Sequence, residues 1–128
     1  MKLLLDTHLL LWVAEPSKRL SADTRELIDD PDNEPVFSAA SIWEVAIKGS
    51  LGRKEFRADP RLLRRSLLDN GYPELLIDSK HAAAVGDLPP IHRDPFDRIL
   101  VAQSIVEGIV LLTHDPIVAQ YGGLVRAV

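Results

Sequence analysis

The chain has 128 residues, of which 46% are hydrophobic and 27% charged, and its formal net charge is −4. This length fits a single domain over residues 1–128 that buries a sizeable core. No segment approaches the roughly 20 apolar residues of a membrane span, and the absence of cysteine excludes thiol catalysis, disulfides and cysteine-ligated zinc. Because the first residues also lack the features of a signal peptide, we expect a protein of the cytoplasm with no membrane partner.

Short apolar strands alternate with helices along the chain. Strands are predicted at residues 2–5, 35–38, 73–77, 109–112 and 124–128. Helices are predicted at residues 7–14, 22–30, 42–47, 60–70, 79–85, 95–107 and from 116 onwards. Ser41 is the expected N-cap of the third helix, Glu15-Pro16-Ser17 ends the first, and Gly49 and Gly52 end the third. The alternation predicts an α/β fold, a three-layer α/β/α sandwich with a mainly parallel central sheet.

Two carboxylates, Asp94 and Asp97, lie three residues apart where the helix from Pro95 begins. Residues at this spacing share one face of a helix, and the apolar residues that follow predict a helix packed deeply in the core. Capping explains the same pattern, because Asp94 before Pro95 fits an N-cap and Asp97 then lies at the positive end of the helix dipole. Both interpretations stay open for this segment taken alone.

Three further acids are expected at the edge of the sheet where ligands bind, outside the carboxyl ends of the strands. Asp6 ends the first strand, Glu44 lies in the helix after the second, and Asp115 follows strand 109–112. Each has a structural alternative: Asp6 and Asp115 as helix caps, and Glu44 as the partner of Lys48 four residues on. Capping does not predict that the acids converge, whereas a hard divalent cation would offset their repulsion. We therefore expect Mg²⁺ or Mn²⁺ rather than zinc.

Other polar side chains flank these acids. The hydroxyls of Thr7, Ser38 and Thr113 are expected to orient a carboxylate or contact phosphate, with turn and cap duties as the alternative. The imidazoles are assigned to surface or supporting positions rather than to catalysis or metal ligation; they are His8, His92 and His114. The two tryptophans are expected to be core or interface aromatics rather than platforms for base stacking; they are Trp12 and Trp43.

Positive charge is concentrated in one part of this acidic chain. Residues 48–65 contain seven basic and two acidic residues, a net charge of +5. Such a segment suits a polyanion held beside an acidic centre, although a solvated helix face explains a charge run more often than not. The candidate nucleic-acid contacts are Lys48, Arg57, Arg61, Arg64, Arg65 and Arg98, with Arg93 as a further choice near the acids.

Four segments in order resemble the motifs of PIN-domain proteins, specifically VapC-type toxins of toxin-antitoxin pairs. They are Leu4-Leu5-Asp6-Thr7-His8, Ser41-Ile42-Trp43-Glu44-Val45, Asp94-Pro95-Phe96-Asp97-Arg98 and Leu112-Thr113-His114-Asp115. The resemblance implies a metal-dependent endoribonuclease, commonly a homodimer, that is inhibited by a cognate VapB antitoxin whose tail lies over the acidic groove. By motif, the acidic quartet of catalytic and metal-binding residues is Asp6, Glu44, Asp97 and Asp115, with Asp94 as a cap or supporting residue.

Two other classes of protein share this length and pattern. A response-regulator receiver domain would be a Mg²⁺-binding signalling module, but it requires an acid pair after the first strand and a lysine after the last. An aspartate-nucleophile phosphatase requires an acid two residues after Asp6, where this chain has His8. A PIN fold retained as a non-catalytic binding module is a third alternative, which the intact quartet disfavours.

Overall fold

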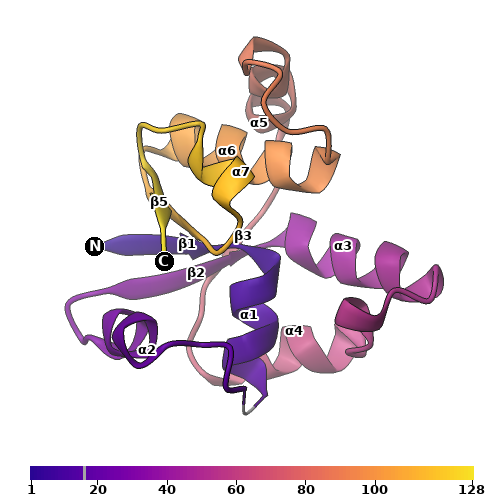
Figure 1. Cartoon of the computed structure of the whole chain (residues 1–128), viewed down its shortest axis with the longest axis vertical. Helices are drawn as coiled ribbons and strands as arrows, with labels where there is room; N and C mark the ends of the chain where they lie inside the picture. Colours follow the sequence, from indigo (N-terminus) through magenta and orange to yellow (C-terminus); the bar gives the residue numbers. More distant parts are fainter. Residues whose placement is uncertain (16) are drawn as a thin grey trace.

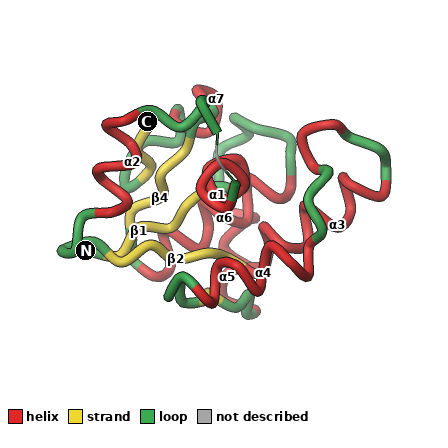
Figure 2. Tube along the Cα trace, turned by 90° about the horizontal axis from the view of Figure 1, so that it is seen from below, coloured by secondary structure: helices red, strands yellow, loops and turns green. Residues whose placement is uncertain are grey.

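Five parallel strands form one central sheet in the computed structural model, which describes residues 1–15 and 17–128. The strands are β1 (Lys2–Leu5), β2 (Glu34–Ser38), β3 (Glu74–Leu75), β4 (Val110–Thr113) and β5 (Val125–Ala127). Their order across the sheet is β3-β2-β1-β4-β5, and each neighbouring pair is parallel. Figure 2 shows β1 between β2 and β4. The predicted parallel sheet is thus confirmed.

Helices cover both faces of this sheet (Figure 1). One face carries α1 (Thr7–Ala14), α2 (Ala22–Asp29) and α4 (Pro60–Asp69); the other carries α6 (Pro95–Glu107) and α7 (Pro116–Ala119), and α5 (Ser79–Ala84) packs against α6. The remaining helix, α3 (Ala39–Ser50), contributes Val45 to the core of the first face and Ala40 to that of the second. This arrangement is the expected three-layer sandwich.

Strand β1 explains how one short apolar segment serves two cores. Leu3 and Leu5 pack into the core beneath α1, α2 and α4, whereas Leu4 packs into the core beneath α6 and α7. Successive side chains of a strand point to opposite faces, and all three leucines are fully buried. A strand buried on both sides therefore has a continuous apolar sequence rather than an alternating one.

The third predicted strand is much shorter than expected. Residues 73–77 were predicted to be extended, but β3 contains only Glu74 and Leu75, which pair with Phe37 and Ser38 of β2. Leu76 and Ile77, which follow β3, are exposed to solvent. The apolar pattern alone predicted a longer strand because it does not reveal that this strand lies at the sheet edge.

The boundaries of α3 also differ from the prediction. Ser41 is not its N-cap: the helix begins at Ala39, and Ser38 caps it by accepting from the backbone N–H of Ala40 (3.0 Å). Gly49 does not end α3 but lies within it, and the position requires glycine because a Cβ would approach the carbonyl oxygen of Phe56 to 2.7 Å. That carbonyl belongs to a short 3₁₀ helix, η1 (Lys54–Phe56), which the sequence did not predict.

Two further expectations concern the ends of α1 and the membrane. The first helix ends at Ala14 with Glu15 as its C-cap, in agreement with the prediction, while Pro16 lies outside the described residues. Within residues 1–15 and 17–128, the helices are too short or too polar to cross a lipid bilayer. A second 3₁₀ helix, η2 (Val85–Asp87), extends α5 toward the loop that leads into α6.

Candidate active site

Asp6 lies at the carboxyl end of the central strand and is both a helix cap and a member of the acidic cluster. Its Oδ1 accepts from the backbone N–H of Leu9 (2.9 Å), which caps α1. Its Oδ2 accepts from the Thr113 hydroxyl (2.7 Å) and from the backbone N–H of His114 (3.0 Å). Burial raises the pKa of the Asp6 carboxyl in spite of these three hydrogen bonds. The two interpretations of this residue are therefore compatible.

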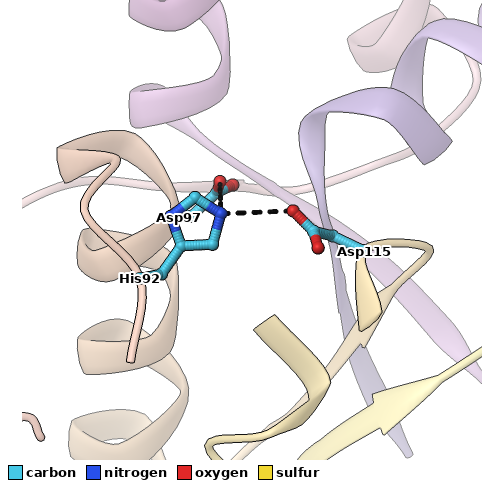
Figure 3. A group of neighbouring side chains, drawn as sticks. All are labelled: His92, Asp97 and Asp115. Carbon is cyan, nitrogen blue, oxygen red and sulfur yellow. Dashed lines mark hydrogen bonds and ion pairs between the residues drawn. The ribbon is translucent and has the colours of Figure 1, made fainter. Parts of the chain in front are cut away.

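A histidine joins two further acids of the predicted quartet (Figure 3). Asp97 lies in the first turn of α6, and Asp115 follows β4 and caps α7. Nε2 of His92 is 3.3 Å from Oδ2 of Asp97 and 3.2 Å from Oδ2 of Asp115. Thr113 connects this pair to Asp6, since its hydroxyl oxygen also accepts from the backbone N–H of Asp115 (3.0 Å).

The hydrogen bonds of His92 define its tautomer. Its Nδ1 accepts from the backbone N–H of Asp94 (3.0 Å), so the proton of the neutral ring is on Nε2. Nε2 then donates toward Asp97 and Asp115 instead of offering a lone pair. A metal-bound histidine has the opposite arrangement, with its second nitrogen acting as a donor. This geometry makes His92 a bridge between two carboxylates and supports the expectation that it is not a metal ligand.

Glu44 is held by two partners from different elements. Its side chain is 2% exposed; its Oε1 accepts from the Thr7 hydroxyl (2.5 Å), and its Oε2 accepts from Nζ of Lys48 (2.6 Å). The Thr7 hydroxyl also lies 3.0 Å from that of Ser41, which explains why Ser41 is buried inside α3 instead of capping it. The predicted Glu44–Lys48 pair therefore exists, and it lies within the acidic cluster.

Lys48, which the sequence offered as a possible nucleic-acid contact, is an internal counter-ion in the structure. Its Nζ lies 2.6 Å from Glu44 and 2.6 Å from Oδ2 of Asp94, and 5.1 Å and 5.5 Å from the ring centroids of Phe56 and Phe96. Burial lowers the pKa of Lys48, but the hydrogen bonds to Asp94 and Glu44 outweigh burial and raise it. The ammonium group thus stays charged beside the acids.

Asp94 is the N-cap of α6, as its position before Pro95 predicted. Its Oδ1 accepts from the backbone N–H groups of Phe96 (2.8 Å) and Asp97 (3.4 Å). Burial opposes ionisation of Asp94, but the hydrogen bond from Lys48 and the charge of Lys48 lower its pKa overall. Asp94 therefore enters the cluster as a carboxylate paired with Lys48.

The carboxyl group of Asp97 is buried near three other acids, and its pKa is strongly raised. Burial raises its pKa to about 8, and the charges of Asp94, Glu44 and Asp6 act in the same direction, while Lys48 opposes them. Two of these charges belong to Asp6, which follows β1, and to Glu44 in α3. These members of the predicted quartet therefore lie close enough to Asp97 to affect its pKa. In the described part of the chain, His92 is the polar side chain that contacts the Asp97 carboxylate.

Two of the three predicted hydroxyls lie against the acids and the third does not. Thr7 orients Glu44 and Thr113 orients Asp6. Ser38 instead donates to Oε1 of the buried Gln103 (2.6 Å) and caps α3. Ser38 does lie at the end of its strand, as predicted. Its hydroxyl has the alternative role, as the cap of a helix.

Arg98 is a structural residue rather than an exposed cation. Its guanidinium donates to the carbonyl oxygens of Val85 (3.1 Å), Pro89 (3.2 Å) and His92 (3.2 Å) and to the Tyr121 hydroxyl (3.1 Å). It thereby holds the loop that positions His92. The remaining candidates are exposed at or near α4, with Arg64 3.8 Å from Glu74; they are Arg57, Arg61, Arg64 and Arg65.

The donor set fits a hard divalent cation. Carboxylate oxygens from four segments converge on one edge of the sheet, and one of them, on Asp97, has a pKa raised by burial and by neighbouring negative charge. An oxygen-rich set of this kind matches Mg²⁺ or Mn²⁺. His92, Asp97 and Asp115 bring a nitrogen and two oxygens within 4.8 Å of one another, although the tautomer of His92 leaves the two carboxylates as the better ligands.

Comparison with known proteins identifies the fold and the family. One similar solved structure is VapBC2 from Rickettsia felis bound to a DNA fragment from their promoter. It has 15% sequence identity and a TM-score of 0.66, and the match covers 99% of this chain and 98% of that chain. Another is VapBC-1 from nontypeable Haemophilus influenzae, with 19% identity and a TM-score of 0.67, where the match covers 100% of this chain and 97% of that chain. No curated protein gives a significant match. The sequence matches the PIN domain family over residues 3–124, nearly its whole length, so the chain belongs to the PIN-domain family.

Proposed function

We propose that this protein is a metal-dependent endoribonuclease that acts as the toxin of a VapBC-type pair in the cytoplasm. The observation that carries the proposal is the gathering of carboxylates at the carboxyl edge of the sheet: the charges of Glu44 and Asp6 help to raise the pKa of Asp97, and His92 joins Asp97 to Asp115. Membership of the PIN family sets aside the receiver-domain and phosphatase alternatives. Capping accounts for Asp6, Asp94 and Asp115, whereas Glu44 and Asp97 lie within α3 and α6.

Within this proposal, Asp97, Asp115 and Asp6 hold Mg²⁺ or Mn²⁺, and Glu44 binds the ion or orients the attacking water. A divalent cation at this place lowers the pKa of its bound water and neutralises charge on the scissile phosphate. The chain's own residues prepare the site: Thr113 and the backbone N–H of His114 fix the Asp6 carboxylate, and Thr7 fixes Glu44. Preorganised ligands need not rearrange when substrate binds.

Lys48 sets the charge of this site. Its ammonium neutralises part of the charge of Glu44 and Asp94 from within the protein, at 2.6 Å from each. Among the described residues, the ion-pair partner shared by Asp97 and Asp115 is His92 rather than a lysine or arginine. We therefore place the catalytic cation at Asp97, Asp115 and Asp6, away from Lys48.

The proposed partner is a VapB-type antitoxin. The solved structures that resemble this chain are described as VapBC assemblies, and their similarity extends over almost the whole chain. We also propose a homodimer, supported by the exposed apolar residues Trp43, Ile47 and Leu51, which recur every four residues along α3. Light scattering of the purified protein, alone and with the antitoxin, tests both assemblies.

Purified, antitoxin-free protein incubated with total cellular RNA tests the activity. We expect new RNA ends with Mg²⁺ or Mn²⁺ and none with excess chelator. The matched control is Asp97→Asn, which should be folded and inactive; Asp69→Asn, on the exposed end of α4, should cleave like the wild type. Cleavage that persists in chelator would remove the metal from the mechanism, and an inactive wild type with bound metal would favour the non-catalytic PIN module.

A further inference from the structure

The ammonium group of Lys48 is enclosed by two acids and two aromatic rings. Its Nζ lies 2.6 Å from Oε2 of Glu44 and 2.6 Å from Oδ2 of Asp94. The ring centroids of Phe56 and Phe96 are 5.1 Å and 5.5 Å from the same nitrogen, and only 13% of the lysine side chain is exposed. A lysine usually keeps its head group in water, whereas a cation close to the face of a ring is attracted to it. This ammonium group is therefore built into the site.

The two acids beside Lys48 have all their oxygens engaged within the chain. Oε1 of Glu44 accepts from the Thr7 hydroxyl, and Oε2 accepts from Lys48. Oδ2 of Asp94 also accepts from Lys48, while Oδ1 accepts from two backbone N–H groups in the first turn of α6. The oxygens that face Lys48 are hard ligands of the kind that a divalent cation prefers. A cation bound to both of them would have to replace the ammonium group, because two positive charges at one place repel each other.

The acids proposed to bind the catalytic cation have a different environment. In the described part of the chain, the ion-pair partner of both Asp97 and Asp115 is His92, so these carboxylates contact no ammonium or guanidinium group. The lysine is nevertheless close to them: burial and three acids raise the pKa of Asp97 and Lys48 lowers it, so the charge of Lys48 acts on this carboxyl. A divalent cation at Asp97 and the ammonium group of Lys48 would therefore be neighbouring positive charges in one site.

We propose that Lys48 takes the place of a second metal ion, so that the site binds one divalent cation per chain, at Asp6, Asp97 and Asp115. This inference rests on the metal site of the proposed function and adds the number of ions to it. Sites with two ions hold them about 3.5 to 4 Å apart, so that both the attacking and the leaving oxygen are stabilised. Here the second positive charge belongs to the protein. Because Lys48 and Thr7 engage the carboxylate of Glu44, its role is to orient the attacking water rather than to bind the ion.

Counting bound Mn²⁺ tests this inference without any RNA. Electron paramagnetic resonance measures free Mn²⁺, and a titration of the purified protein at pH 8 gives the number of ions bound per chain. We expect one ion for the wild type and two for Lys48→Ala, which opens the place between Glu44 and Asp94. Lys48→Arg keeps the positive charge and should bind one ion. The matched control is Lys54→Ala, which removes an exposed lysine of η1 and should also bind one.

A double variant locates the additional ion. Lys48→Ala combined with Asp94→Asn should bind one Mn²⁺ again, because the second ion loses a carboxylate while asparagine still caps α6. Asp94→Asn alone should bind one ion, like the wild type. Circular dichroism checks that each variant is folded. If Lys48→Ala does not fold, Lys48→Gln replaces it, since this variant removes the charge but keeps an N–H donor on a shorter side chain, and it should also bind two ions.

The outcomes separate this inference from the proposed function. Two ions bound to the wild type, or one ion bound to the folded variant without the Lys48 charge, would overturn the inference, and metal-dependent RNA cleavage by the same wild type would leave the ribonuclease standing. If the wild type binds one ion and Lys48→Ala binds two, but the wild type cuts no RNA, the role of Lys48 is supported and the proposed ribonuclease is refuted. A wild type that binds no Mn²⁺ refutes both.

Discussion

Asp97→Asn is the most informative perturbation of the site, because its effect on stability depends on pH. The pKa of Asp97 is about 8 in the folded, metal-free protein, against an ordinary value of 3.8. Between these values the folded state keeps a proton that the unfolded state has lost. The free energy of unfolding therefore decreases as pH rises, by about 1.4 kcal/mol per pH unit, or roughly 4 kcal/mol between pH 4 and pH 7.

Asparagine at this position is always neutral and removes this dependence. We expect Asp97→Asn to have stability close to that of the wild type near pH 4 and to exceed it by a growing margin up to about pH 8, after which the margin stays constant. Urea unfolding in chelator at several pH values measures the margin, and the difference between the two proteins cancels the other titrating groups. Asp69→Asn controls for the removal of one negative charge from the surface.

A margin that does not change between pH 5 and pH 8 would refute the reasoning, since it would show that Asp97 ionises alike in the folded and unfolded states. Metal provides an independent test. Binding requires the ionised carboxylate, so Mn²⁺ binding at pH 7 should release a proton, and affinity should increase up to about pH 8. Titration calorimetry in buffers of different ionisation enthalpy detects this proton in the wild type, and Asp97→Asn should not show it.

Three further predictions concern the structure around the site. Asp94→Ala should lower stability by about 1 to 2 kcal/mol in thermal unfolding, because α6 loses its cap, whereas Asp94→Asn keeps the cap and isolates the loss of charge. Arg98→Gln should accelerate hydrogen exchange in the loop before His92 and leave the salt dependence of RNA binding unchanged; a reduced salt dependence would restore Arg98 as an RNA contact. Gly49→Ala should destabilise by about 1 to 3 kcal/mol, since its Cβ meets the Phe56 carbonyl, and an unchanged melting temperature would contradict that packing.

Local patterns predicted most of the elements, because helix and strand periods and cap residues act over a few positions. The apolar segment at Lys2–Leu5, the cap-proline pair at Asp94 and the αL glycine at Gly108 all appear in the structure where the sequence places them. The exceptions arise where a distant segment decides. Gly49 lacks a side chain because the Phe56 carbonyl lies against it, and of the third predicted strand only Glu74 and Leu75 pair with β2.

The sequence by itself determined which residue types lie at the carboxyl ends of the strands, since parallel strands joined by helices must bring those ends to one edge. Only the tertiary structure decided what each side chain does there. Asp6 and Thr113 are 107 residues apart, and Thr7 and Glu44 are 37 apart. No local pattern encodes such contacts. In the same way, Lys48 lies between two acids, Arg98 donates to loop carbonyls, and Trp12 contacts His114. The direction and the partners of a side chain depend on which distant segments pack against it.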